Sequence, residues 1–172
     1  RDQRAGPRNR HVPLERRGWL PAIYFIFSRA GCEAALRRFV EDGRSLIDAA
    51  AAAEVEAAIA KTQADSPSIQ TDSATNALLF EGLGRGVGMH HAGILPALKR
   101  LTEILFERGL VRVVFATETM SLGIHMPAKT VAIEGLRKRT DFGFRHLTLN
   151  ELTQMAGRAG RRGIDQAGQC VV

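Results

Sequence analysis

The sequence is poor in cysteine and has no long apolar run. Its two cysteines, Cys32 and Cys170, are too few for a disulfide framework, and Cys32 lies in an apolar helical pattern that favours a buried free thiol. No stretch approaches the roughly 20 apolar residues that a membrane-spanning helix needs. The amino-terminal segment is rich in arginine, unlike a secretory signal peptide. We therefore expect a cytoplasmic protein without a membrane partner.

The motifs with which a protein hydrolyses a nucleoside triphosphate by itself are also absent. The chain contains no Gly-Lys pair, so its glycine-rich residues 82–88 do not fit the phosphate-binding loop G-x-x-x-x-G-K-[ST]. It contains no Asp-Glu pair that could hold a magnesium ion. His90 and His91 are adjacent and would point to opposite faces of a strand, so we expect no metal site. Any hydrolysis of ATP would need a second domain.

The net charge of +6 is concentrated at one end of the chain. Residues 1–17 contain six arginines and two acidic residues, which gives this segment a net charge of +4. Such a tail could contact phosphate groups. A solvated linker is the favoured interpretation, because Gly6, Pro7 and Pro13 work against regular structure.

From about Leu20 the sequence alternates apolar strands with helical patterns. Residues 22–27 form the short apolar run typical of a strand covered on both faces. The polar residues 65–73 interrupt the pattern and are expected to be an expendable loop. Strands that alternate with helices predict an α/β fold with a mainly parallel sheet. We expect strands at 22–27, 87–91, 111–116, 130–134 and 169–172, and helices around 32–40 and at 45–64, 74–81, 96–108 and 151–162, with Pro96 opening one helix and Gly109 following its end.

The most informative segment is residues 154–163, Gln-Met-Ala-Gly-Arg-Ala-Gly-Arg-Arg-Gly. On a helix over 151–162, the side chains of Gln154, Arg158 and Arg161 would share one face. Two permanently charged guanidinium groups one turn apart suit a polyphosphate, because each offers a planar fork to phosphate oxygens.

The residues around these arginines support a special role for the segment. Asn150 is expected to N-cap the helix and Gly163 to end it. Gly157 and Gly160 would leave a stripe beside the arginines open to a ligand or another backbone. A solvated arginine-rich face is the alternative, and it does not account for the glycines.

This segment resembles motif VI of superfamily 2 helicases, in the Gln-Met version of the Ski-like RNA helicases. Residues 25–33 resemble motif IV, residues 113–127 resemble motif V, and residues 89–96 resemble a family loop that follows the nucleic-acid backbone. The resemblance covers residues 21–172. It implies a RecA-like three-layer α/β sandwich, the second RecA-like domain of such an enzyme, cut at its C-terminal end. The domain would span 20–172 and follow a basic linker at 1–19.

The resemblance also implies two sets of contacts. Arg158 and Arg161 would act as arginine fingers on the γ-phosphate of ATP, whose Mg²⁺ the preceding RecA-like domain would hold. Gln154, Gly123 and His125 would be further nucleotide contacts, although the family usually has Asn or Asp where this chain has His125. The residues that would contact nucleic acid follow the strands; they are Ser28, Arg29, His91, Ala92, Gly93, Thr117, Glu118 and Thr119.

The implied function is that of the C-terminal motor half of an ATP-dependent RNA helicase. Its partners would be single-stranded RNA, the preceding domain and, as a candidate, an RNA-degrading complex. A DNA-repair helicase is the first alternative, but DNA-acting relatives tend to have proline at the position of Arg162. A non-catalytic nucleic-acid-binding module is the second. Four basic residues fit an RNA-binding loop and solvated charge equally well: Arg137, Lys138, Arg139 and Arg145.

Overall fold

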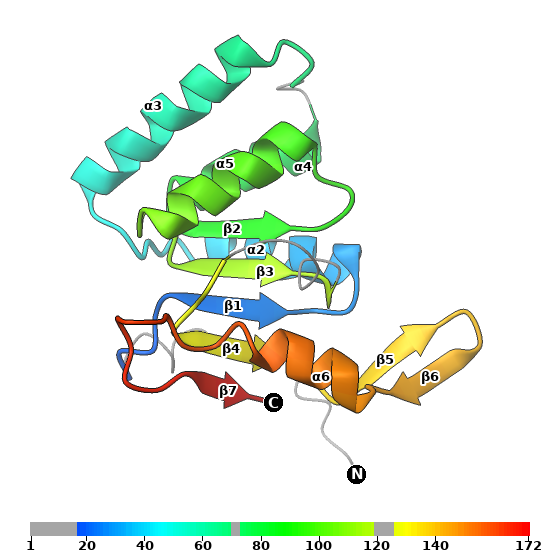
Figure 1. The fold of residues 1–172 in the computed structure, drawn as a ribbon. Helices are drawn as coiled ribbons and strands as arrows, with labels where there is room; N and C mark the ends of the chain where they lie inside the picture. The colour runs from blue at the N-terminus through cyan, green and yellow to red at the C-terminus, as the bar shows by residue number, and fades with distance from the viewer. Residues whose placement is uncertain (1–16, 70–72, 119–125) are drawn as a thin grey trace.

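The central sheet is built around strand β1, Ala22–Phe25, whose neighbours on both sides run parallel to it. The computed structural model describes residues 17–69, 73–118 and 126–172, and the sheet they form has the order β2-β3-β1-β4-β7 (Figure 1). Every neighbouring pair is parallel, as predicted. The other strands are β2, Val87–His90; β3, Val113–Ala116; β4, Thr130–Ile133; and β7, Gln169–Val171.

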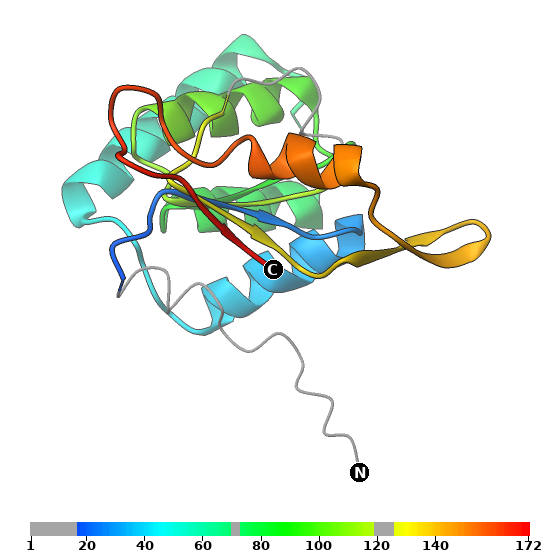
Figure 2. The same cartoon turned by 60° about the horizontal axis from the view of Figure 1, so that its bottom comes forward.

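Helices cover both faces of this sheet. Helix α2, Arg29–Glu41, packs against α4, Ala74–Leu83, and α5, Pro96–Glu107, packs against α3, Ala49–Asp65. Helix α6, Leu149–Ala156, lies on the face opposite α2 (Figure 2). Strands β1 to β4 are buried along their whole length. This burial explains why their sequences are mostly apolar rather than alternating, with His90 at the end of β2 and Thr130 at the start of β4 as polar exceptions.

Short-range signals in the sequence set the helix ends. Ser28 N-caps α2, because its hydroxyl accepts a hydrogen bond from a main-chain N–H of the first turn at 3.0 Å. Pro96 opens α5, as predicted. At the other end, Gly109 adopts φ +75° and the N–H of Leu110 donates to the carbonyl of Leu105 at 2.9 Å. Together with the hydrogen bond from Gly109 N–H to the carbonyl of Phe106 at 3.0 Å, this bond forms a Schellman motif, which confirms the expected role of Gly109.

The contact between α2 and α4 is tight enough to require glycine. A Cβ added at Gly82 would lie 2.5 Å from the Leu36 side chain and 2.8 Å from the carbonyl oxygen of Val87. Gly82 therefore belongs to a close helix contact inside α4, one residue beyond the predicted end of that helix at residue 81. On α2, Cys32 is completely buried. Burial raises the pKa of its thiol to about 12, so the expected buried, unreactive thiol is confirmed.

Two predicted helices have different ends, and one element was not predicted. Helix α3 begins at Ala49 rather than at residue 45, because Asp48 N-caps it by accepting a hydrogen bond from Ala51 N–H at 2.8 Å. Helix α4 continues to Leu83. An antiparallel hairpin joins β5, Arg137–Thr140, to β6, Gly143–His146. Its strands are charged and exposed, so they lack the apolar alternation that predicts a strand.

The polar segment 65–73 is not the expendable loop that its composition suggests. Asp65 ends α3, and Ser73 N-caps α4. Between them Ile69 is only 7% exposed and belongs to the hydrophobic core. A single apolar residue within a polar stretch gives no periodicity, which is why the pattern missed its burial.

We expect Ile69→Ala to lower the free energy of unfolding of the 172-residue chain by about 2–4 kcal/mol, because it removes a buried side chain and leaves a cavity. The matched control is the exposed neighbour Ser68, whose substitution by Ala should change stability by less than about 0.5 kcal/mol. Urea denaturation followed by circular dichroism measures both values. Equal effects of the two substitutions would show that the segment does not pack against the core.

Candidate nucleotide and nucleic-acid interface

The residues expected to contact nucleic acid meet at the carboxyl edge of the sheet. Ser28 and Arg29 follow β1, residues 91–93 follow β2, and Thr117 and Glu118 follow β3. Because β2, β3 and β1 are adjacent and parallel, their ends lie side by side. Open parallel sheets bind ligands at this edge. The structure thus brings together residues as far apart in the chain as Ser28 and Glu118.

Some side chains at this edge are exposed, and others already hold the structure together. Arg29 is exposed at the first position of α2, whereas the hydroxyl of Ser28 is engaged in capping that helix. Ala92 and Gly93 are exposed in the turn after β2. The edge therefore offers one exposed guanidinium group and a stretch of accessible main chain.

His91 differs from the expectation of a nucleic-acid contact, because its side chain is 2% exposed. Its Nδ1 accepts a hydrogen bond from Gly93 N–H at 3.1 Å, and its Nε2 lies 3.8 Å from a carboxylate oxygen of Glu33 on α2. Burial lowers the pKa of His91. The imidazole therefore shapes the turn from inside. His90 points the other way, with its Nε2 3.0 Å from Glu103 on α5, which confirms that the two histidines face opposite sides.

Three of the expected contacts lie outside the described residues. They are Thr119, Gly123 and His125, and their roles stay predictions.

The arginine-rich segment does not continue α6, so the predicted helix over 151–162 is wrong. The helix has eight residues and ends at Ala156. Its N-cap is Thr148 and not Asn150, because the side chain of Thr148 and that of Glu151 form a reciprocal capping box. The sequence Thr-Leu-Asn-Glu contains this capping signal, which begins two residues before Asn150.

Beyond α6 the chain is pinned to the segment that enters β4. Ala128 N–H donates to the carbonyl of Arg158 at 3.0 Å, and Gly160 N–H donates to the carbonyl of Ala128 at 2.7 Å. Gly160 adopts φ +90°, and a Cβ there would lie 3.2 Å from the backbone nitrogen of Gly168. Glycine is thus needed for a left-handed turn against another backbone, and not for a bare stripe on a helix. The segment lies at the amino edge of the sheet, opposite the carboxyl edge (Figure 1).

This backbone course separates the three residues that were expected to share a helical face. Gln154 lies within α6, whereas Arg158 and Arg161 lie beyond its end. Arg158 is half-buried, and its carbonyl makes the bond to Ala128. The side chain of Arg161 is 28% exposed and is held by Asp165.

The pair formed by Arg161 and Asp165 is the best-defined charged contact of the segment. Nε of Arg161 donates to Oδ2 of Asp165 and Nη2 donates to Oδ1, each at 2.8 Å. This bidentate contact lowers the pKa of Asp165 to about 2 and raises that of Arg161. Sequence reasoning missed Asp165, although its spacing of four residues from Arg161 could have indicated a turn closed by an ion pair.

A hollow of about 300 Å³ adjoins this pair. It opens between the segments that lead into β1, β3 and β4 and the end of α5. Its lining contains apolar side chains and three arginines, and consists of Pro21, Phe106, Glu107, Gly109, Arg112, Pro127, Arg161, Arg162 and Ile164.

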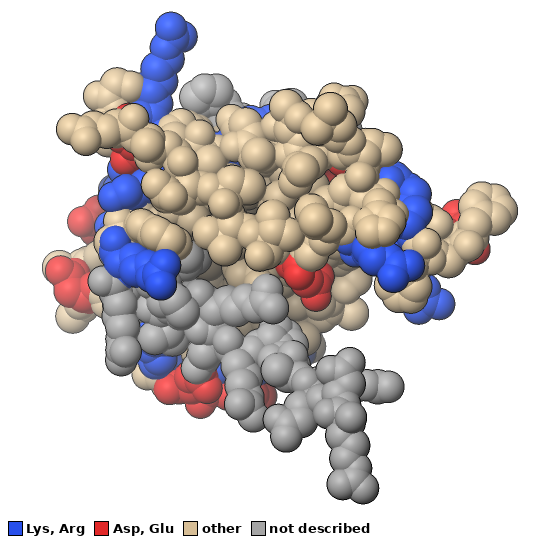
Figure 3. Space-filling model, turned by 90° about the horizontal axis from the view of Figure 1, so that it is seen from below, with Lys and Arg blue, Asp and Glu red and all other residues tan. Residues whose placement is uncertain are grey.

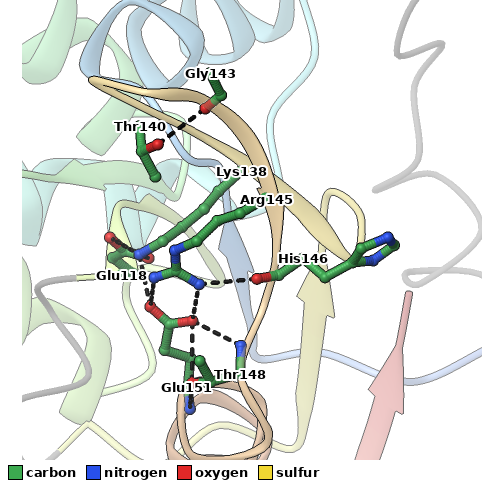
Figure 4. A network of polar contacts seen from close by, with 8 residues as sticks. All are labelled: Glu118, Lys138, Thr140, Gly143, Arg145, His146, Thr148 and Glu151. Atoms are coloured by element: carbon green, nitrogen blue, oxygen red, sulfur yellow. Dashed lines mark hydrogen bonds and ion pairs between the residues drawn. The ribbon is translucent and has the colours of Figure 1, made fainter.

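A network of four charged side chains joins the hairpin to α6 and to the end of β3 (Figure 4). Nζ of Lys138 lies 2.7 Å from carboxylate oxygens of both Glu118 and Glu151. Arg145 donates to both oxygens of Glu151, at 2.7 and 2.8 Å. The hydrogen bonds from Arg145, Lys138 and the main chain of Thr148 strongly lower the pKa of Glu151. Burial alone would lower the pKa of Lys138, but its hydrogen bonds to the two glutamates raise it.

This network divides the four basic residues whose role the sequence left open into two groups. Lys138 and Arg145 are paired with acidic groups of the chain, whereas Arg137 and Arg139 are exposed. Basic side chains gather at the base of the hairpin, and the tip is mostly uncharged (Figure 3). The tip carries two exposed aromatic residues, Phe142 and Phe144.

Comparison with known proteins decides the family. Residues 45–163 match the model of the helicase conserved C-terminal domain, which is more than half of the chain. The chain belongs to this helicase family. The helicase domain is 48% identical over 159 residues to the DExH-box ATP-dependent RNA helicase DExH15, chloroplastic, of Arabidopsis thaliana. It is 45% identical over 163 residues to the probable helicase HelY of Mycobacterium tuberculosis and 39% identical over 159 residues to human Superkiller complex protein 2.

Each of these alignments covers 92% of the helicase domain but only 13% to 18% of the relative. The similarity confirms the Ski-like superfamily 2 assignment and the RecA-like α/β fold that the motifs implied. It concerns one domain of much longer proteins.

In the helicase domain, Glu151→Gln should lower the free energy of unfolding by about 1–2 kcal/mol at neutral pH, because it weakens charge-assisted hydrogen bonds that are partly screened by solvent. The pKa of Glu151 is lowered by folding, so its stabilisation is present above the unfolded-state pKa of about 4.3 and is lost as the pH falls below it. Thermal unfolding between pH 7 and pH 3 should therefore show the wild-type and variant melting temperatures converging in acid.

The control for this substitution is Glu81→Gln. Glu81 pairs with Arg85 at 3.0 Å, but its side chain is 51% exposed. An exposed pair contributes little, so this variant should melt close to wild type at every pH. A constant gap between wild type and Glu151→Gln from pH 7 to pH 3 would contradict the role of the ionised carboxylate.

Proposed function

We propose that this domain is the C-terminal motor half of an ATP-dependent RNA helicase. Its membership of the helicase C-terminal family supports the proposal, as do relatives named as RNA helicases. The observation that carries it is the arrangement of two sets of residues on one sheet. The arginine-rich segment is fixed at the amino edge, and the nucleic-acid candidates gather at the carboxyl edge. A single rigid body can therefore contact nucleotide and nucleic acid at once.

In this proposal the amino-edge arginines serve ATP that is bound on a preceding RecA-like domain. Arg158 and Arg161 neutralise the negative charge that grows on the γ-phosphoryl oxygens during hydrolysis. Gln154, together with Gly123 and His125, would contribute nucleotide contacts. The preceding domain would supply the phosphate-binding loop and the residues that hold Mg²⁺, and closure of the two domains would complete the site. Two arginines three positions apart, on a segment fixed by backbone hydrogen bonds, suit a polyphosphate, because each guanidinium group offers a planar fork to phosphate oxygens.

At the carboxyl edge, Arg29, Thr117 and the exposed turn at Ala92 and Gly93 would follow the phosphate backbone of a single strand. Guanidinium, hydroxyl and main-chain N–H groups are the usual partners of phosphate oxygens. Ser28, His91 and Glu118 would act through their positions in the turns, because their side chains already hold the structure. Arg162 favours RNA over DNA as the nucleic acid, because DNA-acting relatives tend to have proline at this position.

We also propose a partner and a location for the complete protein. Human Superkiller complex protein 2 is named for a complex, and an RNA-degrading complex is a candidate partner of the complete protein. Of the helices that the structure describes, none has the length and apolar character of a membrane span. We propose the cytoplasm as its location.

In the complete helicase, Arg161→Ala should lower kcat for ATP hydrolysis by about 10³-fold or more, because a charge that acts in the transition state is lost. Arg161→Lys should not restore activity, since an ammonium group cannot form the planar fork. Arg162→Ala is the matched control and should lower kcat by less than about tenfold. Steady-state hydrolysis at saturating RNA measures all three. A larger loss for Arg162→Ala than for Arg161→Ala would show that the wrong arginine has been assigned.

The RNA path is tested with two arginines on α2. Arg29→Ala should weaken binding of single-stranded RNA and reduce by about 1 the slope of log affinity against log salt concentration, because one phosphate contact is lost. Arg37, also exposed on α2 but two turns farther along, is the control. Fluorescence anisotropy over a salt series measures both, with DNA of the same sequence for comparison. Equal slopes for the two variants would exclude Arg29 from the path, and tighter binding of DNA would favour a DNA helicase.

A further inference from the structure

Asp165 holds Arg161 at both its main chain and its side chain. The N–H of Arg161 donates to Oδ2 of Asp165 at 2.9 Å, and the Nε and Nη2 groups donate to the same carboxylate, each at 2.8 Å. In return, the N–H of Asp165 donates to the carbonyl of Arg161 at 3.0 Å. The carboxylate side chain is 5% exposed, whereas the arginine side chain is 28% exposed. The acidic partner is thus enclosed, and the guanidinium group reaches the surface.

The bonding pattern leaves a defined part of the guanidinium group available. Arginine has five N–H donors in a planar fork. Asp165 takes the Nε donor and one donor of Nη2. The second donor of Nη2 and one donor of Nη1 point in parallel from the end edge of the group, where none of the described residues takes them. That edge still presents the pair of parallel donors that binds two oxygens of a phosphate group.

From this geometry we infer that Asp165 is a positioning residue for Arg161. It fixes the plane of the guanidinium group and directs its free edge outward. The inference rests on the proposed function of Arg161 as an arginine finger. Asp165 itself need not touch the nucleotide.

A fixed guanidinium group is useful for the chemistry proposed here. An arginine side chain loses several rotatable torsions when it is ordered, and this loss opposes binding if it occurs during the reaction. Asp165 orders the side chain in advance, so the donors need no reorganisation when charge develops on the phosphoryl group. The pKa of Asp165, lowered to about 2, keeps its carboxylate ionised at any pH near neutrality.

The arginine that follows Arg161 has a different setting. Arg162 is the next residue and is exposed. Its side chain lines the same hollow as Arg161. Arg161 is paired with a carboxylate of the segment that follows it, because Asp165 lies four residues later, where the turn brings it back.

The test uses the complete helicase with Asp165→Asn and Asp165→Ser. Both remove the charge, and serine retains an oxygen that can accept the hydrogen bond of the Arg161 main chain. Each should lower kcat for ATP hydrolysis by on the order of 10²-fold, because misplacing a catalytic group by about 1 Å has an effect of this size. The KM for ATP and the RNA affinity should change by less than about threefold. Gln166→Ala, at the exposed next position, is the control and should match wild type.

A double-mutant cycle separates positioning from a purely structural role. In an Arg161→Ala background, Asp165→Asn should lower kcat no further, because the group that it positions is already gone. If the effects multiply instead, Asp165 acts independently of Arg161 and the inference is wrong. It is also wrong if both Asp165 variants keep wild-type kcat, or if kcat rises, since a rise would mean that Asp165 holds Arg161 away from ATP.

The failure of the inference can be told apart from that of the proposed function. If Arg161→Ala leaves kcat unchanged, the arginine-finger proposal itself fails. If Arg161→Ala abolishes turnover while Asp165→Ser does not affect it, only the positioning role fails. If Asp165→Asn does not fold, the test rests on Asp165→Ser. This variant supports the inference only if its melting temperature lies within about 2 °C of wild type. A larger decrease in melting temperature would assign Asp165 a structural role.

Discussion

Parallel pairing of β1 with both β3 and β4 is the constraint on which the rest of the structure depends. Ala22 aligns with Val113 on one side and with Thr130 on the other, so three strands begin and end at the same level. Their continuous burial fixes this arrangement, because an unpaired main-chain group inside the sheet would be strongly unfavourable. All the turns that leave the strands therefore emerge along one edge, and all the segments that enter them lie along the other.

The same constraint explains how distant parts of the chain become functionally related. Segments that enter strands β1, β3 and β4 contribute Pro21, Arg112 and Pro127 to the hollow beside Arg161. The segment after α6 reaches this place because Ala128 accepts and donates hydrogen bonds as a strand would. A short bridge outside the named strands thus extends the order of the sheet to the arginines. The pairing of the backbone with Ala128, and not helix α6, therefore sets the position of Arg161.

Much of the fold could be predicted from the sequence, because strand and helix signals agree with the tertiary structure. The buried strands are mostly apolar runs, and local chemistry sets helix ends: Ser28 and Pro96 begin helices, and Gly109 follows the end of one. The site was less predictable. Gly157 to Gly160 fit a helix by periodicity, but the structure uses Gly160 for a left-handed turn against Gly168. Ile69 was missed because one apolar residue in a polar stretch gives no periodicity, and the hairpin because its charged strands lack apolar alternation. Asp165 was missed although its spacing of four residues from Arg161 is a local signal.

The charged network of the hairpin has a consequence for the electric field around the molecule. Lys138 and Arg145 carry two positive charges, and Glu118 and Glu151 carry two negative charges, all within a few ångströms. Opposite charges at such separations cancel beyond about one Debye length, roughly 8 Å at physiological ionic strength. A polyanion approaching from solution would respond mainly to Arg137 and Arg139 at this place. The number of basic residues on the hairpin therefore overstates the attraction that this part of the surface exerts on a nucleic acid.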